Sequence, residues 1–256
     1  MFIVEIQFPI PEAHDPSDVE RSAWSLLAAW FKNGQVYKHY HLFAAPAGGL
    51  RAIATIPEET ALDDVHADKS VENAMAKFCA DGRAPPMVEI KGEESEAVRP
   101  CACESRKNLV LITDFVSSES PVKCLDCYGV VPLYRLPNFA HIEGLLFWQG
   151  DYKACDTLQI GCTTGERFAL REMDRADSTL SRNGRDLCKT IEESSGIPTY
   201  YYLHKYYGRS HAQEWKRRCP SCVGPWLMPK RIEPIFDFRC DRCRLLSNIA
   251  FSLGAG

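Results

Sequence analysis

Four cysteines near the C-terminus constrain the fold of this chain more than any other feature. They form two C-x-x-C pairs, Cys219 with Cys222 and Cys240 with Cys243, and seventeen residues separate the pairs. Zinc prefers four sulfur or nitrogen donors at the corners of a tetrahedron, and a C-x-x-C turn can place two sulfurs on one ion. The spacing therefore predicts a zinc ribbon over about residues 215–250. Four thiolates fill the coordination shell, so we expect a structural zinc; two unrelated pairs of buried thiols are the alternative.

A second group of cysteines, Cys101, Cys103, Cys124 and Cys127, is a candidate for a second zinc site. Cys124 and Cys127 have the C-x-x-C spacing, whereas a single residue separates Cys101 from Cys103. In a regular strand these two side chains would point the same way, at a pitch that fits one ion poorly. A turn between them would remove this difficulty, and buried or unpaired thiols are the alternative.

The remaining cysteines are Cys79, Cys155, Cys162 and Cys188. Cys79 and Cys188 lie on the apolar faces of predicted helices, where packing is the simpler explanation. Cys155 or Cys162 could serve a cysteine enzyme only with a nearby base and an electropositive pocket, which the sequence does not reveal. We therefore expect a protein that is not an enzyme.

The cysteine usage and the N-terminus favour a reducing compartment. The chain of 256 residues begins MFIVEIQFPI, which carries Glu5 and has no basic leader, and no run of eighteen apolar residues follows. It contains no N-x-S/T sequon. These features predict a cytoplasmic protein with reduced thiols and no membrane partner.

The N-terminal residues are predicted to form a ferredoxin-like α+β domain over 1–95. A capping box at Ser17 and Glu20 begins the first helix, which Gly34 ends. The order β-α-β-β-α-β carries this prediction. The elements are a strand over 2–8, a helix up to Asn33, strands over 37–45 and 50–56 joined across Pro46 to Gly49, a helix through Val71, Met75 and Phe78 closed by Gly82, and a strand over 87–92.

An acidic stretch, GEESEAVRP over 92–100, is the predicted linker because it mixes charges with Gly and Pro. Beyond it we expect a cysteine-rich α+β domain over 96–256 that ends in the zinc ribbon. Strands are predicted over 108–115 and 129–136, and a helix over 177–195 that Gly196 and Pro198 end.

Charge is unevenly distributed. The net charge is -4, with nine basic and sixteen acidic residues in 1–100 but ten basic and four acidic residues in 205–244. The C-terminal excess could attract phosphate or an acidic protein. Tyrosines beside these cations could stack on bases or make protein contacts, although a strand with an aromatic core face is the simpler alternative. The candidate binding residues are Tyr201, Tyr206, Arg209, Lys216, Arg217, Arg218, Lys230 and Arg231.

Five segments, CLDCYGVVPLYRLP, DYKACDTLQIGCTTGERFAL, GIPTYYYLHKYYGRS, CPSCVG and CDRCRLLSNIA, resemble a bacterial zinc-ribbon-containing family of unknown function that has been described as a candidate nucleic-acid-binding family. The resemblance implies zinc at the four C-terminal cysteines. The cysteine-pair blocks are also similar to those of double-CXXCG immunity proteins, which neutralise bacterial toxins. Here Tyr128 and Val223 stand between the last cysteine of a pair and its glycine.

The sequence therefore predicts a zinc-ribbon binding protein with one zinc ion or two. A protein partner, such as a cognate toxin, is the first expectation, because the chain is acidic overall and lacks a continuous basic stripe. Nucleic-acid binding through the cations of the C-terminal region is the alternative.

Overall fold

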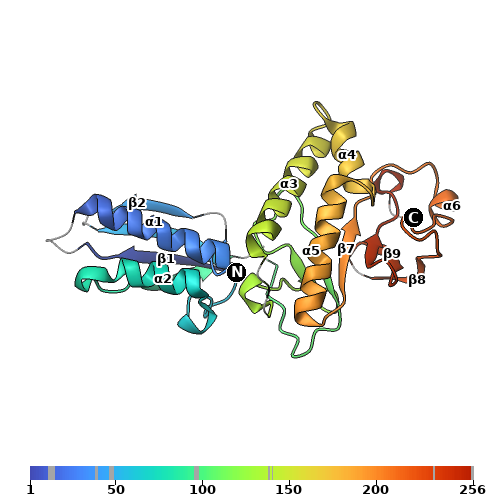
Figure 1. Ribbon diagram of the computed structural model, residues 1–256. Helices are drawn as coiled ribbons and strands as arrows, with labels where there is room; N and C mark the ends of the chain where they lie inside the picture. Colours follow the sequence, from blue (N-terminus) through green and yellow to red (C-terminus); the bar gives the residue numbers. More distant parts are fainter. Residues whose placement is uncertain are drawn as a thin grey trace. The chain divides into compact units, whose positions relative to one another are not determined.

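The computed structural model describes residues 1–10, 15–37, 40–45, 49–94, 98–137, 139, 141–232 and 234–254 of a mixed α+β protein with two sheets (Figure 1). Two compact units divide the chain. The first comprises Met1–Ala102, Ser118–Ser120 and Cys127–Pro137, and the second comprises Cys103–Ser117, Pro121–Asp126 and Asn138–Gly256. Within the described residues, no helix combines the length and the hydropathy that a membrane crossing requires.

The first unit has the predicted β-α-β-β-α-β order of elements. They are β1 (Phe2–Phe8), α1 (Pro16–Asn33), β2 (His41–Ala44), β3 (Leu50–Ile56), α2 (Lys69–Phe78) and β4 (Met87–Glu93). The antiparallel sheet has the order β2-β3-β1-β4. One face of this sheet forms the core, because Val4, Ile6 and Phe8 of β1 alternate with less buried residues and pack with side chains from both helices.

The first helix begins at a different residue from the one predicted. Asp15 is its N-cap, and the Asp15 carboxylate accepts a hydrogen bond from the Ser17 amide at 3.0 Å. The capping box at Ser17 and Glu20 is therefore wrong, because Pro16 already occupies the first turn. Gly34 ends the helix as predicted, with φ of 78°. Pro46 to Gly48 of the predicted hairpin loop and 95–97 of the predicted linker lie outside the described residues.

The second unit contains a sheet of the order β6-β5-β7-β10-β9-β8 and its helices. Figure 1 shows α3, α4 and α5 packed beside one another in this unit. The elements are β5 (Leu109–Leu111), β6 (Val122–Cys124), α3 (Ile142–Gly161), α4 (Glu166–Asp174), α5 (Thr179–Ser195), β7 (Thr199–Leu203), α6 (His211–Glu214), β8 (Leu227–Ile232), β9 (Phe236–Cys240) and β10 (Leu245–Ser247).

Two predicted strands differ in the structure. Only Leu109–Leu111 of the strand expected over 108–115 is extended, and 129–136 forms a single bridge at Val130 followed by a 3-10 turn over Leu133–Arg135. Pro132 has no amide hydrogen to give to a strand partner, which accounts for the turn. The helix expected over 177–195 is α5, with Ser178 as its N-cap.

The predicted ribbon hairpin exists as β8 and β9, and it belongs to the larger sheet. β9 pairs with β10, and β10 pairs in parallel with β7, whose five residues are all buried. Phe236 of β9 meets the ring of Tyr202 at 5.6 Å. The hairpin therefore shares its core with the second unit.

Candidate metal centres

The four C-terminal thiols converge as the sequence predicts. The sulfurs of Cys219, Cys222, Cys240 and Cys243 all lie within 4.8 Å of one another. The Cys222 and Cys240 sulfurs are 3.6 Å apart. A tetrahedral zinc ion with sulfurs at about 2.3 Å requires sulfur–sulfur distances of about 3.8 Å. The donor set and its spacing therefore fit one zinc ion held by four thiolates.

The backbone around these cysteines forms two similar turns. Val223 follows the first pair with φ of 59°, and Arg244 follows the second pair with φ of 52°. The Val223 amide donates to the Cys219 carbonyl at 2.9 Å, and the Cys219 amide donates to the Gly224 carbonyl at 3.0 Å. The hydrogen bond from the Val223 amide to the Cys219 carbonyl closes the turn over the first pair, and a left-handed residue follows each pair.

Hydrogen bonds lower the pKa of one C-terminal thiol, whereas burial raises the pKa of two others. The amide of Gly224 donates to Cys222 and lowers the pKa of that thiol to about 7. Burial raises the pKa of Cys240 to about 12 and also raises the pKa of Cys219. A cation must therefore displace protons from the buried thiols, and its affinity will fall as the pH falls.

The second group of cysteines also comes together. The sulfurs of Cys101, Cys103, Cys124 and Cys127 lie within 4.8 Å of one another. Residues 101–108 are not a strand, so the unfavourable pitch of two alternate strand residues does not arise. This group can hold a second zinc ion.

Gly129 explains the local sequence of the second group. A Cβ at this position would lie 2.8 Å from the Cys101 Cα atom, so only glycine allows this approach. The Gly129 amide lies 3.3 Å from the Cys127 sulfur, to which it donates. Tyr128 takes the left-handed conformation, with φ of 58°, as Val223 does in the other group.

Burial disfavours the thiolate form of two of the other cysteines. Cys188 is buried, and burial raises its pKa well above the ordinary value. Burial also raises the pKa of Cys155 to about 11, which disfavours a nucleophilic thiolate. Cys162 is exposed, and its sulfur lies 3.1 Å from the Gln159 carbonyl. All twelve cysteines are described, and none of them forms a disulfide.

Two of the predicted binding residues are structural. Tyr201 of β7 is fully buried, which corrects its prediction as a surface contact: β7 is a central strand whose two faces are both covered. Arg217 lies over the rings of Phe238 and Trp226, at 4.2 and 5.2 Å from their centroids, and donates to the Asn248 carbonyl at 2.8 Å. Its guanidinium therefore fixes the C-terminal region.

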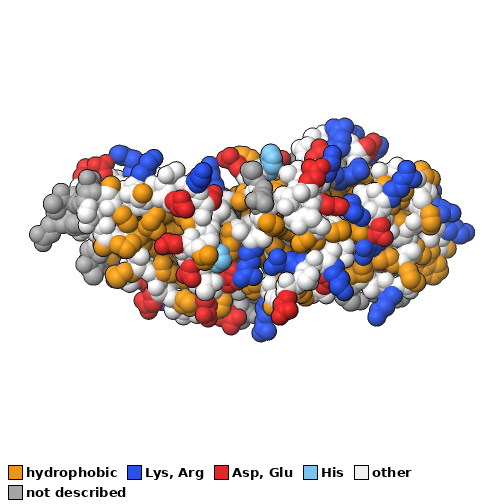
Figure 2. Space-filling model, turned by 60° about the horizontal axis from the view of Figure 1, so that its bottom comes forward, with side chains coloured by type: hydrophobic (Ala, Val, Ile, Leu, Met, Phe, Trp, Pro, Cys, Tyr) orange, Lys and Arg blue, Asp and Glu red, His pale blue; other side chains and the backbone are white. Residues whose placement is uncertain are grey.

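The other predicted cations lie on the surface. Five of them are exposed: Arg209, Lys216, Arg218, Lys230 and Arg231. Arg231 also forms an ion pair with the Asp237 carboxylate at 3.7 Å. Tyr206 is half-buried against Tyr207, at 4.9 Å between the ring centroids. Figure 2 shows Lys and Arg side chains gathered over the C-terminal part.

The candidate binding residues of the sequence analysis leave out two exposed aromatic residues and a set of arginines. Tyr207 and Trp215 are 55% and 57% exposed, the most exposed aromatic rings of the C-terminal region. Arg182 and Arg185 of α5 and Arg242 line a groove beside Cys222 and Cys243. The spacing of Arg182 and Arg185 on one helix face was the available signal.

Three family models match the chain, each described as a domain of unknown function. They are DUF8589 over residues 1–92, DUF2310 over residues 103–204 and DUF8594 over residues 208–253. None of these descriptions mentions a zinc ribbon or an immunity protein, so both resemblances stay predictions.

Two proteins of Haemophilus influenzae, each called "Uncharacterized protein", are similar to this chain. One is 30% identical over 259 residues, covering 98% of this chain and 99% of the relative. The other is 41% identical over 145 residues, covering 56% of this chain and 71% of the relative.

Two solved structures resemble a part of the chain. "Crystal structure of antibiotic biosynthesis monooxygenase" has 20% identity and a TM-score of 0.28, covering 36% of this chain and 96% of that chain. "Structure of Rv0793 from Mycobacterium tuberculosis" has 19% identity and a TM-score of 0.26, covering 37% of this chain and 95% of that chain. Scores this low carry no argument about activity.

Proposed function

The chain belongs to the same family as the uncharacterized Haemophilus influenzae protein that it matches along nearly its whole length, and from this premise we propose that it is a zinc-stabilised binding protein and not an enzyme. The observation that carries the proposal is the convergence of Cys219, Cys222, Cys240 and Cys243 within 4.8 Å. Four thiolates leave no open position for an activated water, so zinc would act on structure.

The metal part of the proposal is tested by counting zinc. The purified chain, dialysed against metal-free reducing buffer, is expected to retain two zinc ions, one in each cysteine group. Cys222→Ser should remove the C-terminal ion alone and Cys124→Ser the other alone. Cys162→Ser, which changes an exposed thiol outside both groups, is the control. Zinc that is absent from the wild-type chain would contradict the proposal.

A protein partner is the binding function that the surface supports best. Trp215 and Tyr207 are exposed close in sequence to Arg209 and Arg218, and Trp, Tyr and Arg are the residues most enriched among binding hot spots. The acidic first hundred residues oppose binding to nucleic acid without sequence preference. Neutralisation of a bacterial toxin is the form of protein binding that the resemblance to immunity proteins implies.

An affinity purification with two matched variants tests this function. Trp215→Ala should lose the partner that the wild-type chain retains. Phe168→Ala, which removes an aromatic ring of similar exposure, 59%, from α4, should retain it. A partner that survives Trp215→Ala, or the absence of any retained partner, would count against the proposal.

Nucleic-acid binding is the second candidate, favoured by the exposed cations Arg209, Lys216, Arg218 and Lys230. If these side chains contact phosphates, the affinity for a fluorescent single-stranded oligonucleotide will fall steeply between about 50 and 200 mM salt. Lys216→Gln should reduce the salt dependence. Binding that does not change with salt would eliminate this candidate.

A further inference from the structure

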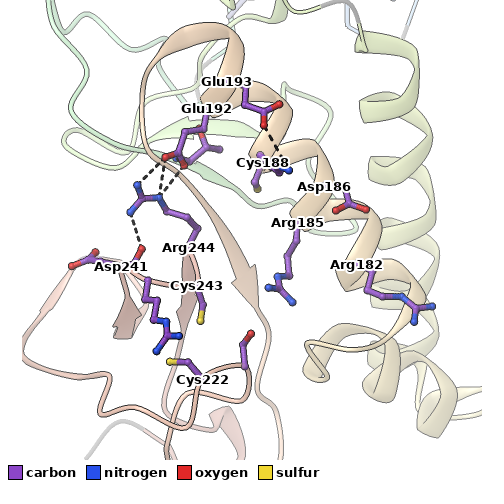
Figure 3. A pocket seen from close by; sticks show the side chains of 14 residues that line it. Arg182, Arg185, Asp186, Cys188, Glu192, Glu193, Cys222, Asp241, Cys243 and Arg244 are labelled. Carbon is purple, nitrogen blue, oxygen red and sulfur yellow. Dashed lines mark hydrogen bonds and ion pairs between the residues drawn. The ribbon is translucent and has the colours of Figure 1, made fainter.

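A groove in the second unit separates α5 from the loops that carry Cys222 and Cys243 (Figure 3). Its volume is about 910 Å³, which lies within the range of small-molecule sites. A neighbouring cavity of about 520 Å³ shares three residues with this groove, Arg182, Arg185 and Ser221. These three residues therefore stand where the two cavities meet.

Most carboxylates that line the two cavities already have a cationic partner. The pairs are Glu192 with Arg244, Glu193 with Lys189, Asp241 with Arg239, Asp177 with Arg175 and Asp174 with Lys205. Among the described residues, Asp186 is the one lining carboxylate that has no ion pair. The fixed negative charge of the walls is thus largely neutralised.

The arginines at the junction are not neutralised in this way. Arg182 donates to the Thr179 hydroxyl at 3.4 Å, and Arg185 donates to the Ala176 carbonyl at 3.3 Å. Neither forms an ion pair within 4.0 Å in the described part of the chain, although the charge of Arg182 also acts on Asp177 and helps to lower the pKa of that carboxyl. Figure 3 shows Arg185 extending from α5 into the space before Cys222 and Cys243. Both guanidinium groups therefore keep donors for an external anion.

Arg242 has a different position. It stands between Cys240 and Cys243 in the sequence and lines the same groove. Zinc held by four thiolates carries a net negative charge, which a neighbouring guanidinium offsets. Arg182 and Arg185, unlike Arg242, line both cavities.

We propose that Arg185 and the Ser221 hydroxyl bind the phosphate group of a phosphorylated small molecule, whose remaining part occupies the larger cavity. Arg182, whose guanidinium points away from Arg185 (Figure 3), adds positive charge where the two cavities meet. Planar guanidinium groups match the oxygens of phosphate, which they bind with two parallel hydrogen bonds. The site goes beyond the proposed function, because its phosphate-binding residues are neither zinc ligands nor Trp215, and its ligand is not a macromolecule. Cys222 and Cys243 do line the larger cavity.

Calorimetric titration of the zinc-loaded full chain with inorganic pyrophosphate tests the proposal. The wild-type chain should bind pyrophosphate. Arg185→Gln should weaken this binding about tenfold or more, since one charge-assisted contact is lost. Arg167→Gln, which removes an exposed arginine of α4 away from both cavities, should leave the affinity unchanged.

Zinc content, measured on each variant, separates a lost ligand contact from a lost fold. If Arg185→Gln no longer retains zinc, Arg182→Gln carries the test, with a smaller expected weakening because the Arg182 guanidinium points away from Arg185. The absence of wild-type binding at millimolar pyrophosphate would overturn the proposal. Equal weakening by Arg167→Gln would also overturn it, because the anion would then respond only to general surface charge.

Discussion

Arg244, the residue after the last zinc ligand candidate, forms a two-point ion pair with Glu192 of α5. The Arg244 Nε atom lies 2.9 Å from Glu192 Oε2, and Nη2 lies 2.8 Å from Oε1 (Figure 3). Glu192 Oε2 also accepts from the Thr199 amide at 3.2 Å. One carboxylate thereby joins the second cysteine turn, α5 and the start of β7.

Glu192→Gln is expected to lower the free energy of unfolding by about 1 kcal/mol. The loss is small because both partners are about a third exposed, so that water screens the ion pair. Urea unfolding followed by tryptophan fluorescence measures this loss. The hydrogen bonds from Arg244 lower the pKa of Glu192 in the folded protein. The ion pair therefore stabilises the fold above the unfolded pKa of about 4.3, and this stabilisation is lost as the pH falls through the lower folded pKa. The control is Glu193→Gln, whose pair with Lys189 is longer, 3.7 Å, and more exposed. Equal losses from the two variants would contradict this account.

Val223→Gly is expected to stabilise the protein by about 1 kcal/mol. Val223 has φ of 59° and is 72% exposed, so glycine relieves backbone strain and sacrifices little packing. Thermal unfolding of the zinc-loaded protein measures the change. Val116→Gly is the matched control, because Val116 is 70% exposed and has no positive φ; it should be neutral or destabilising. A loss of stability in Val223→Gly would show that this turn is not strained.

His204 should make stability depend on pH. Burial lowers the pKa of His204 to about 4, while Asp174 acts in the opposite direction, and the Nε2 atom has no hydrogen-bond partner among the described residues. The unfolded chain binds a proton near pH 6.5, so stability should fall by about 2 kcal/mol between pH 7 and pH 5 through this group. His204→Phe keeps an aromatic ring beside Tyr206 and Phe251 and should lack this component. Parallel pH profiles for the two proteins would rule out the assignment.

Much of the first unit follows from its sequence, because each element carries its own signal. The strand over 2–8 and the paired strands β2 and β3 follow from the alternation of apolar residues. The end of α1 follows from its glycine. The sequence predicts the N-cap at Ser17, although the structure has it at Asp15, because both residue types can cap a helix and Pro16 decides between them.

The second unit was less predictable because tertiary packing determines it. α3 went unpredicted, since apolar residues are spread around it and leave no single stripe. Tyr201 was predicted at a surface because its neighbours include charges, but β7 is covered on both faces. The cysteine groups were predictable from spacing alone, whereas the groove depends on α5 meeting a loop far away in the sequence.

X-ray absorption at the zinc edge tests the central claim most directly. The purified, reduced chain is expected to give a first shell of four sulfurs at about 2.3 Å, the signature of zinc held by cysteine thiolates. A shell that contains oxygen or nitrogen ligands, or a chain that folds and remains stable without zinc, would contradict a structural zinc centre at Cys219, Cys222, Cys240 and Cys243.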